Sequence, residues 1–216
     1  MNTFGKKAGL VVLALLATSV ANADNDFGLG VKVGTLGIGL EASWKPLPYM
    51  DIRIGTSSYD YDNDGKYGNI NYDAVFALDQ YYATANFHFP ISPMRITAGV
   101  YSNGNEFLLV NDQLQDIGGY PGGLIGTITS KTTFSDRAPY LGIGFDFTLA
   151  GKVGLNFDLG VLWQGDPEVT LEVDGILKDD QNFRDEVLDP ERQALEDDLS
   201  DFKAWPVISL GFVYQF

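Results

Sequence analysis

Short segments of the chain alternate large apolar residues with small or polar ones, most clearly in the last segment. One face of that segment carries Ile208, Leu210, Phe212, Tyr214 and Phe216, and the other carries Val207, Ser209, Gly211, Val213 and Gln215. A period of two puts successive side chains on opposite faces of a β-strand. The same alternation recurs at 27–34, 38–45, 51–55, 81–89, 95–101, 140–147, 153–164 and 207–216. The pattern therefore predicts an all-β chain of eight strands.

The composition of the two faces indicates which one points outward. The apolar faces are rich in Phe, Leu, Ile, Trp and Tyr, whereas the opposite faces are rich in glycine and polar residues. An eight-stranded barrel is only wide enough for side chains to fill it. Because the large apolar side chains do not all fit inside, we expect them to face lipid. This favours an antiparallel transmembrane β-barrel over a soluble, lipocalin-like barrel, which would need the reverse packing.

The first 23 residues have the organisation of a secretory signal peptide. Lys6 and Lys7 precede an apolar stretch at 8–20, and Ala21-Asn22-Ala23 has the small residues of a cleavage site. The stretch is too short to span a bilayer as a helix, and no later run approaches the length that would. We expect a signal peptide at 1–23 and an outer-membrane barrel at 24–216.

The connections between the predicted strands are of two kinds. Tight turns are expected at 46–48, 90–93 and 150–152, long loops at about 59–79, 103–138 and 165–204, and a short outer turn at Thr35–Leu36. Outer-membrane barrels have short periplasmic turns and long extracellular loops. Aromatic residues should then mark the membrane interfaces. We expect Trp44, Phe87, Phe89, Phe147 and Phe216 at the periplasmic rim, and Tyr81, Trp163 and Trp205 at the outer rim.

Negative charge is concentrated in the long loops. The whole chain has a formal charge of -15, and loop 165–204 alone holds 14 acidic residues against 4 basic ones. Such an acidic surface argues against nucleic acid as a partner. It would attract small cations, or it would solvate the loops and bridge divalent ions at lipopolysaccharide. The candidate residues in these loops are Asp60, Asp62, Asp64, Asp166, Asp179 and Asp180.

Charged residues also occur on the inward faces of the strands. The cations are Lys32, Lys45, Arg53 and Arg95, and the anions are Glu41, Asp51, Asp146 and Asp158. Equal numbers of each sign are typical of paired ions, since an unpaired charge is costly in a low-dielectric interior. Such pairs could close the lumen, or they could line a narrow polar pore. The many inward glycines leave room and favour the pore, with all of these charges except Lys45 as lumen selectivity residues.

Three motifs carry candidate chemistry. Residues 60–65 match the first half of an EF-hand loop, but position 12 is Asn71 and no helices flank it, so an acidic loop tip is favoured over a metal site. Asp189 and Pro190 can start a loop helix over 189–202, with Leu195, Leu199 and Phe202 on one stripe. His88 is the only histidine, and its strand offers no partner for a nucleophile. Together with the lack of cysteine, this favours a protein that is not an enzyme and has no cofactor.

Several segments resemble the CarO-type porins, the family associated with ornithine uptake and carbapenem susceptibility. The resemblance lies in 137–145 (RAPYLGIGF), in 163–171 (WQGDPEVTL), and in the acidic helix at 189–202 followed by Trp205-Pro206-Val207. More generally, the strands are similar to those of small OmpA- and OmpW-like barrels. The resemblance implies an outer-membrane channel for small basic amino acids such as ornithine. The terminal Phe216 also resembles the signal read by the barrel-assembly machinery.

The sequence thus predicts passive uptake of small, cationic solutes across the bacterial outer membrane. The alternative is a closed barrel with a structural or surface-interaction role, in contact with lipopolysaccharide, divalent ions or other cells.

Overall fold

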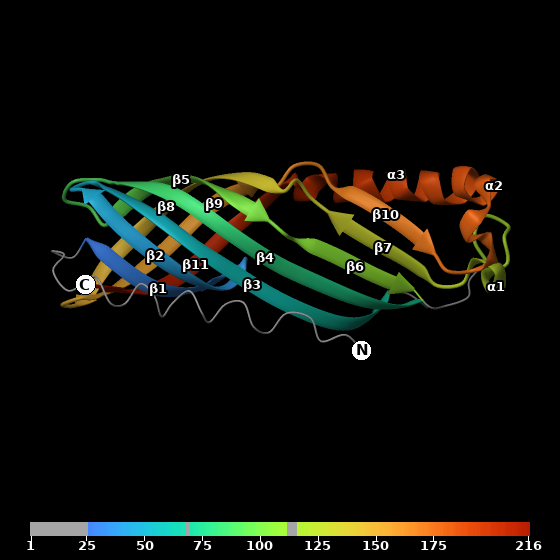
Figure 1. Cartoon of the computed structure of the whole chain (residues 1–216), viewed down its shortest axis with the longest axis horizontal. Helices are drawn as coiled ribbons and strands as arrows, with labels where there is room; N and C mark the ends of the chain where they lie inside the picture. Colours follow the sequence, from blue (N-terminus) through green and yellow to red (C-terminus); the bar gives the residue numbers. More distant parts are fainter. Residues whose placement is uncertain (1–25, 68–69, 112–115) are drawn as a thin grey trace.

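A closed antiparallel barrel of eight strands forms the centre of the molecule, as the alternation predicted. The computed structural model describes residues 26–67, 70–111 and 116–216, so the predicted signal peptide at 1–23 lies outside the described residues. The barrel strands are β1 (Phe27–Gly34), β2 (Gly37–Leu47), β3 (Met50–Tyr67), β4 (Ile70–His88), β5 (Met94–Asn103), β8 (Arg137–Ala150), β9 (Val153–Trp163) and β11 (Ala204–Gln215). Pairing of β1 with β11 and of β4 with β5 closes the ring (Figure 1).

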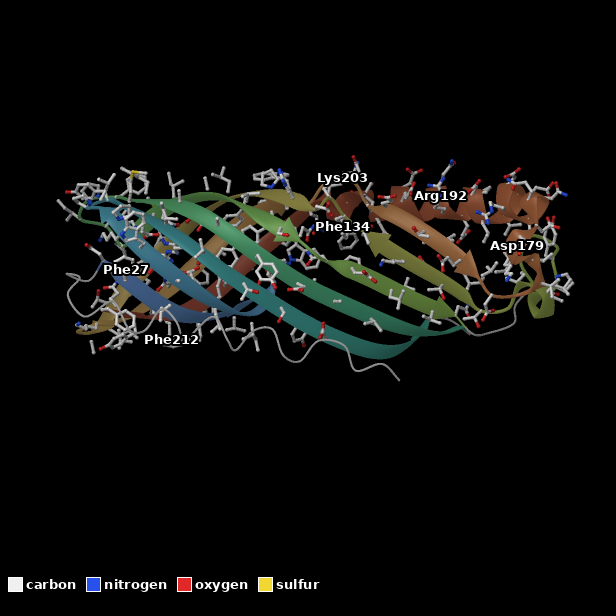
Figure 2. The ribbon with its side chains drawn as sticks, viewed as in Figure 1. Phe27, Phe134, Asp179, Arg192, Lys203 and Phe212 are labelled. Carbon is white, nitrogen blue, oxygen red and sulfur yellow. The ribbon has the colours of Figure 1, made fainter. Side chains whose placement is uncertain are left out.

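Burial alternates along the strands, with small and polar side chains inside. In β5, Arg95 and Thr97 are buried whereas Ile96 and Val100 are exposed. The exposed apolar side chains include Phe27 and Phe212, which are labelled on the barrel in Figure 2. A closed barrel satisfies every backbone hydrogen bond within its wall, and an outward apolar band requires lipid. Among the described residues, no helix is long and apolar enough to cross a membrane.

The two ends of the barrel differ in their connections. Tight turns join β2 to β3 at Pro48–Tyr49 and β8 to β9 at Gly151–Lys152, and the longer connections lie at the opposite end. The predicted aromatic rims include side chains that are exposed toward lipid at both ends, among them Trp44 and Trp163. Trp205 is an exception, because it packs inward against the buried cluster instead of marking the outer rim. The short turns mark the periplasmic end.

The long segments predicted as outer loops contain strands and helices of their own beyond the barrel, which the alternation did not predict. Strands β3 and β4 continue beyond the barrel as one long hairpin, and β6 (Glu106–Asn111), β7 (Ile128–Thr133) and β10 (Glu168–Val173) extend this sheet (Figure 1). The extension has its own apolar cluster of Ile125, Phe183 and Leu188, which gives these segments a core to fold around. Residues 60–65 are paired with β4 as regular strand, so they do not adopt an EF-hand loop.

The helical segment before the last strand is longer than predicted. It begins at α2 (Gln181–Phe183), passes through a π-helical turn at Arg184–Leu188, and continues as α3 (Asp189–Asp198) and a 3-10 turn at Leu199–Lys203. Asp180 caps its start by accepting a hydrogen bond of 3.0 Å from the Phe183 N–H. Asp189 is therefore inside the run and is not its cap. A separate short helix, α1 (Gly122–Ile125), lies at the tip of the extension, and α3 runs along β10 (Figure 1).

Candidate functional site

A cluster of charged side chains fills the periplasmic half of the lumen. All seven lumen residues predicted from the sequence are members, and they come from six strands: Lys32, Glu41, Asp51, Arg53, Arg95, Asp146 and Asp158. The pleat explains this placement, because each residue lies on the inward face of its strand. We call these residues together with His88 the ionic cluster.

Arg53 is the central link of the ionic cluster. Its guanidinium lies 3.0 Å from Asp51, 3.4 Å from Glu41 and 3.1 Å from Asp146. Glu41 also accepts a hydrogen bond of 3.4 Å from Lys32 Nζ, with which it forms an ion pair. One planar guanidinium with five N–H donors can satisfy carboxylates on several strands at once. These contacts join β1, β2, β3 and β8 across the lumen.

Arg95 holds the opposite side of the cluster. Its Nε lies 3.0 Å from Asp146 Oδ2, and its Nη2 lies 2.7 Å from Asp158 Oδ1 as an ion pair without hydrogen-bond alignment. Nη1 donates to Asn86 Oδ1 at 3.0 Å and to Thr97 Oγ1 at 2.5 Å. The charged groups therefore pair with one another from strand to strand.

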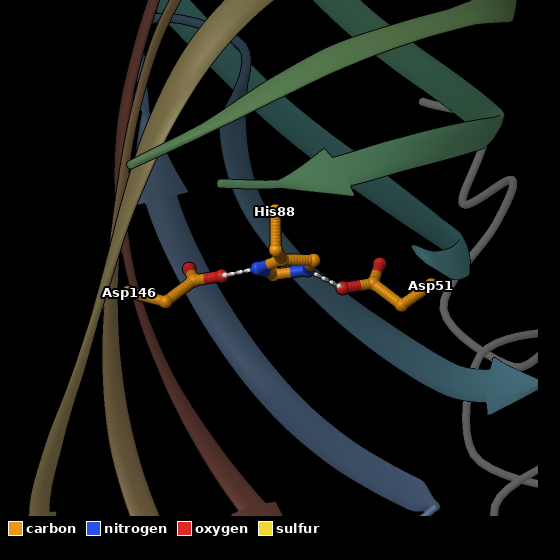
Figure 3. Close-up of side chains that lie close together, drawn as sticks. All are labelled: Asp51, His88 and Asp146. Carbon is orange, nitrogen blue, oxygen red and sulfur yellow. Dashed lines mark hydrogen bonds and ion pairs between the residues drawn. The ribbon is translucent and has the colours of Figure 1, made fainter. Parts of the chain in front are cut away.

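His88 occupies the periplasmic end of the cluster, between two carboxylates (Figure 3). Its Nε2 lies 2.5 Å from Asp51 Oδ2, and its Nδ1 lies 3.6 Å from Asp146 Oδ2. The sequence predicted Lys45 as the fourth inward cation, but Lys45 is exposed at the periplasmic rim and His88 takes that place. A protonated imidazole would give the cluster four groups of each sign. Carboxylates are the partners of both ring nitrogens, an arrangement that lacks the hydroxyl of a serine–histidine pair.

Asp51, His88 and Asp146 also have the spacing of a metal-binding group, with ligand atoms within 4.8 Å of one another. The same two carboxylates, however, already bind guanidinium groups: Arg53 contacts both, and Arg95 contacts Asp146. A metal ion would have to compete with these fixed positive charges, so the arrangement favours the ion-paired state.

Three buried tyrosines close the lumen above the ionic cluster. Tyr82 and Tyr101 stack with ring centroids 4.9 Å apart, and Tyr101 lies 5.4 Å from Tyr140. The Tyr82 hydroxyl donates to Glu41 at 2.9 Å, which ties this tyrosine layer to the ionic cluster. These tyrosines lie on the faces of glycine and polar residues that the alternation predicts to point inward, but the sequence did not indicate their role. The signal was a large aromatic ring on a face otherwise made of glycine and polar residues.

The inward glycines do not leave an open path, which corrects the argument that favoured a pore. Gly55 lies directly against the Tyr82 hydroxyl, and Gly142 and Gly160 lie against the Tyr140 ring. A side chain at these positions would collide with the tyrosines, so the glycines provide the space that the rings fill. Three cavities in the lumen have volumes of about 10 Å³ each, about the space of one water molecule.

A chain of buried amides forms a further layer toward the extracellular side. Gln80 Nε2 donates to Asn105 at 2.6 Å, and Asn105 Nδ2 donates to Gln164 at 3.2 Å. Gln164 Nε2 in turn donates to the Phe202 carbonyl at 2.8 Å. Sequence reasoning missed Gln80 and Asn105, because both positions fell in or beside segments predicted as long loops.

The acidic residues predicted in the loops do not converge on one site. Asp60, Asp62 and Asp64 lie along the outer half of β3, and Asp60 is exposed. Asp166 is exposed near the end of β9 and pairs with Lys203 at 2.5 Å. Asp179 lies near the far tip of the extension (Figure 2), next to the helix cap Asp180. Their negative charge is spread over the whole extension.

The closed barrel, the lipid-facing apolar band and the polar interior define a bacterial outer-membrane β-barrel protein. Its fold is similar to that of two solved structures from Acinetobacter baumannii. CarO2 matches with a TM-score of 0.61 and 22% identity over 88% of this chain and 98% of that chain. CarO matches with a TM-score of 0.59 and 22% identity over 88% and 97%. At this level of identity, the likeness confirms the predicted resemblance for the fold. No protein-family model and no curated protein matches the chain.

Proposed function

We propose that the protein is an outer-membrane channel for passive uptake of small cationic solutes such as basic amino acids, and that its lumen is closed in this conformation. The observation that carries the proposal is the acidic extension above a lumen lined with charged groups. A cation attracted by the extension would meet Glu41, Asp158 and Asp146 in turn along the barrel. The predicted resemblance to CarO-type porins supports the same solute class.

In this proposal the ionic cluster and the tyrosine layer act as the gate. Passage requires the tyrosine rings to move. It also requires the ammonium group of the solute to replace a guanidinium or lysine side chain at its carboxylate. The cluster favours cations over anions, since its four carboxylates outnumber the three permanently charged cations Lys32, Arg53 and Arg95. Lys32, Arg53 and Arg95 would set the size and sign of what passes. The proposal includes insertion of the protein into the outer membrane by the barrel-assembly machinery, which the terminal Phe216 led us to expect.

Solute flux into proteoliposomes tests this function. The purified protein should admit radiolabelled lysine or ornithine faster than glutamate, and the difference should shrink at high salt because screening weakens the acidic surface. Replacing Asp166, Asp179 and Asp180 together by asparagine should slow lysine entry. The matched control is Asp26→Asn, which neutralises an exposed carboxylate beside β1 at the periplasmic end. Equal flux of lysine and glutamate would contradict the proposed selectivity.

A closed structural or surface-interaction barrel is the second candidate, and a specific observation favours it. The ionic cluster is internally paired, and the lumen cavities are each about the size of one water molecule. In that case the acidic extension would meet lipopolysaccharide through divalent ions. A correctly folded barrel that passes none of the solutes would establish this second candidate. Neither candidate assigns the protein a catalytic reaction.

A further inference from the structure

A lateral groove opens in the wall of the molecule above the short β1–β2 hairpin. Its volume is about 460 Å³, within the range of about 300–1,000 Å³ that is typical of small-molecule sites. The side chains that line it are mainly apolar: Val33, Ile38, Tyr59, Leu78, Phe107 and Trp205. This groove is far larger than the cavities in the lumen.

Unequal strand lengths create the groove. Strand β1 ends at Gly34 and β2 begins at Gly37, whereas β3 and β4 continue well beyond this level (Figure 1). The inner face of the β3–β4 hairpin is therefore only partly covered above the short turn, where Tyr59 is exposed and Leu78 is buried. Tyr59 and Leu78 are register partners on that inner face. Behind them, Phe107 lies 6.5 Å from Trp205 between ring centroids.

The floor of the groove is closed, so the groove is separate from the lumen path. Leu36, in the short turn, is buried among Tyr82, Tyr101 and Val207. These residues lie below the groove and belong to the tyrosine layer and its apolar surroundings. A molecule in the groove would thus reach the side of the protein without passing the ionic cluster.

The groove is continuous with the lipid-facing surface. Val33 and Ile38 form its lower edge, and they are 53% and 63% exposed on the outward faces of β1 and β2. They continue the apolar band that the barrel presents to the membrane, at the level of the outer leaflet. The apolar lining interacts weakly with water. An apolar chain that enters the groove removes its own surface and that of the lining from water, which is favourable.

The indole ring of Trp205 forms the back of the groove. Its indole N–H is buried and finds no acceptor among the described residues. A buried donor without a partner is costly. The N–H faces away from the groove, since its accessible area is below 1 Å², so a molecule in the groove meets the apolar face of the indole ring.

We propose that the groove binds an acyl chain of an outer-leaflet lipid, which enters from the side over Val33 and Ile38. This site is independent of the proposed channel function, since it lies outside the closed lumen. The bound chain covers the apolar side chains left open by the short hairpin. It also connects the ordered extracellular extension to the membrane surface.

Fluorescence quenching by brominated lipids tests the proposal. The protein has Trp44, Trp163 and Trp205, and a Trp44→Phe/Trp163→Phe variant keeps only the groove tryptophan. This variant is reconstituted in phosphatidylcholine vesicles with brominated acyl chains. The reference is a variant that keeps only Trp44, which faces lipid. Folding is checked by the heat-sensitive electrophoretic mobility of the barrel.

We expect Trp205 to be quenched by brominated lipid to an extent similar to Trp44, and to be shielded from aqueous acrylamide. Adding Val33→Phe should narrow the entrance and reduce the quenching of Trp205. The matched control is Val31→Phe, which lies on the same outward face of β1 but does not line the groove, and it should leave the quenching unchanged. Quenching of Trp205 by acrylamide alone would overturn the proposal in favour of a water-filled groove. Quenching by neither agent would overturn it in favour of a closed one.

Discussion

Replacing Arg95 by methionine should strongly destabilise the barrel. Arg95 is 1% exposed and contacts Asp146 and Asp158 at 3.0 and 2.7 Å. A charge pair at about 4 Å is worth about 4 kcal/mol at an effective dielectric constant of about 20, and desolvation of the charges offsets part of this. Removing Arg95 leaves the buried carboxylate of Asp158 uncompensated, whereas Asp146 keeps its pair with Arg53. Breaking a buried pair in this way costs about 3–5 kcal/mol. We expect the free energy of unfolding to fall by that amount.

Urea unfolding in lipid vesicles, followed by tryptophan fluorescence and by electrophoretic mobility, measures this change. The matched control is Arg137→Met at the exposed outer end of β8, which should change stability by no more than about 0.5 kcal/mol. Adding Asp158→Asn to Arg95→Met should recover about 1 kcal/mol or more, because it removes one uncompensated charge. A loss below about 1 kcal/mol for Arg95→Met, with an unchanged slope against urea, would refute the reasoning.

Three further substitutions test other parts of the structure. Tyr82→Phe removes the hydrogen bond to Glu41 and should cost about 1.5–3 kcal/mol in the same urea assay; if the lipid-facing change Tyr81→Phe costs as much, the bond is not the cause. Phe183→Ala empties the apolar cluster of the extension and should cost about 3–5 kcal/mol there. Trypsin should then cleave the extension while the barrel keeps its folded mobility, and unchanged resistance would contradict this. Asp180→Ala should weaken the helix by about 1 kcal/mol and raise cleavage less, whereas Asp180→Asn should preserve resistance.

The barrel could be predicted from the sequence because the period of two decides both the strands and their faces. In β11, the alternation of Ile208 and Leu210 with Val207 and Ser209 fixed which side chains meet lipid, and the structure places them so. The same alternation predicted that the seven charged lumen residues point into the barrel. These inferences are local, since each depends on a single strand and on the narrowness of an eight-stranded barrel.

The closure of the lumen could not be predicted in this way, because it depends on contacts between strands. Gly142 and Gly160 look like open space when each strand is considered alone, yet both lie against the Tyr140 ring. Likewise, Lys45 and His88 have inward parity, but only His88 lies deep enough to meet Asp51. Parity gives the face of a side chain and not its depth along the barrel. The ordered extension was not predicted, because the many acidic residues of these segments led to their interpretation as loops. Their few apolar residues, such as Phe183, were not recognised as a core.

Single-channel recording in planar bilayers under a salt gradient tests the gated cation channel most directly. The comparison is between the natural protein and a Tyr82→Ala/Tyr140→Ala variant that keeps the folded mobility of the barrel. The account predicts that the natural protein is mostly closed with brief openings. The variant should stay open longer, with a reversal potential that shows cation selectivity. A folded variant that stays silent, or that selects anions, would contradict the claim that the tyrosine layer gates a cation path.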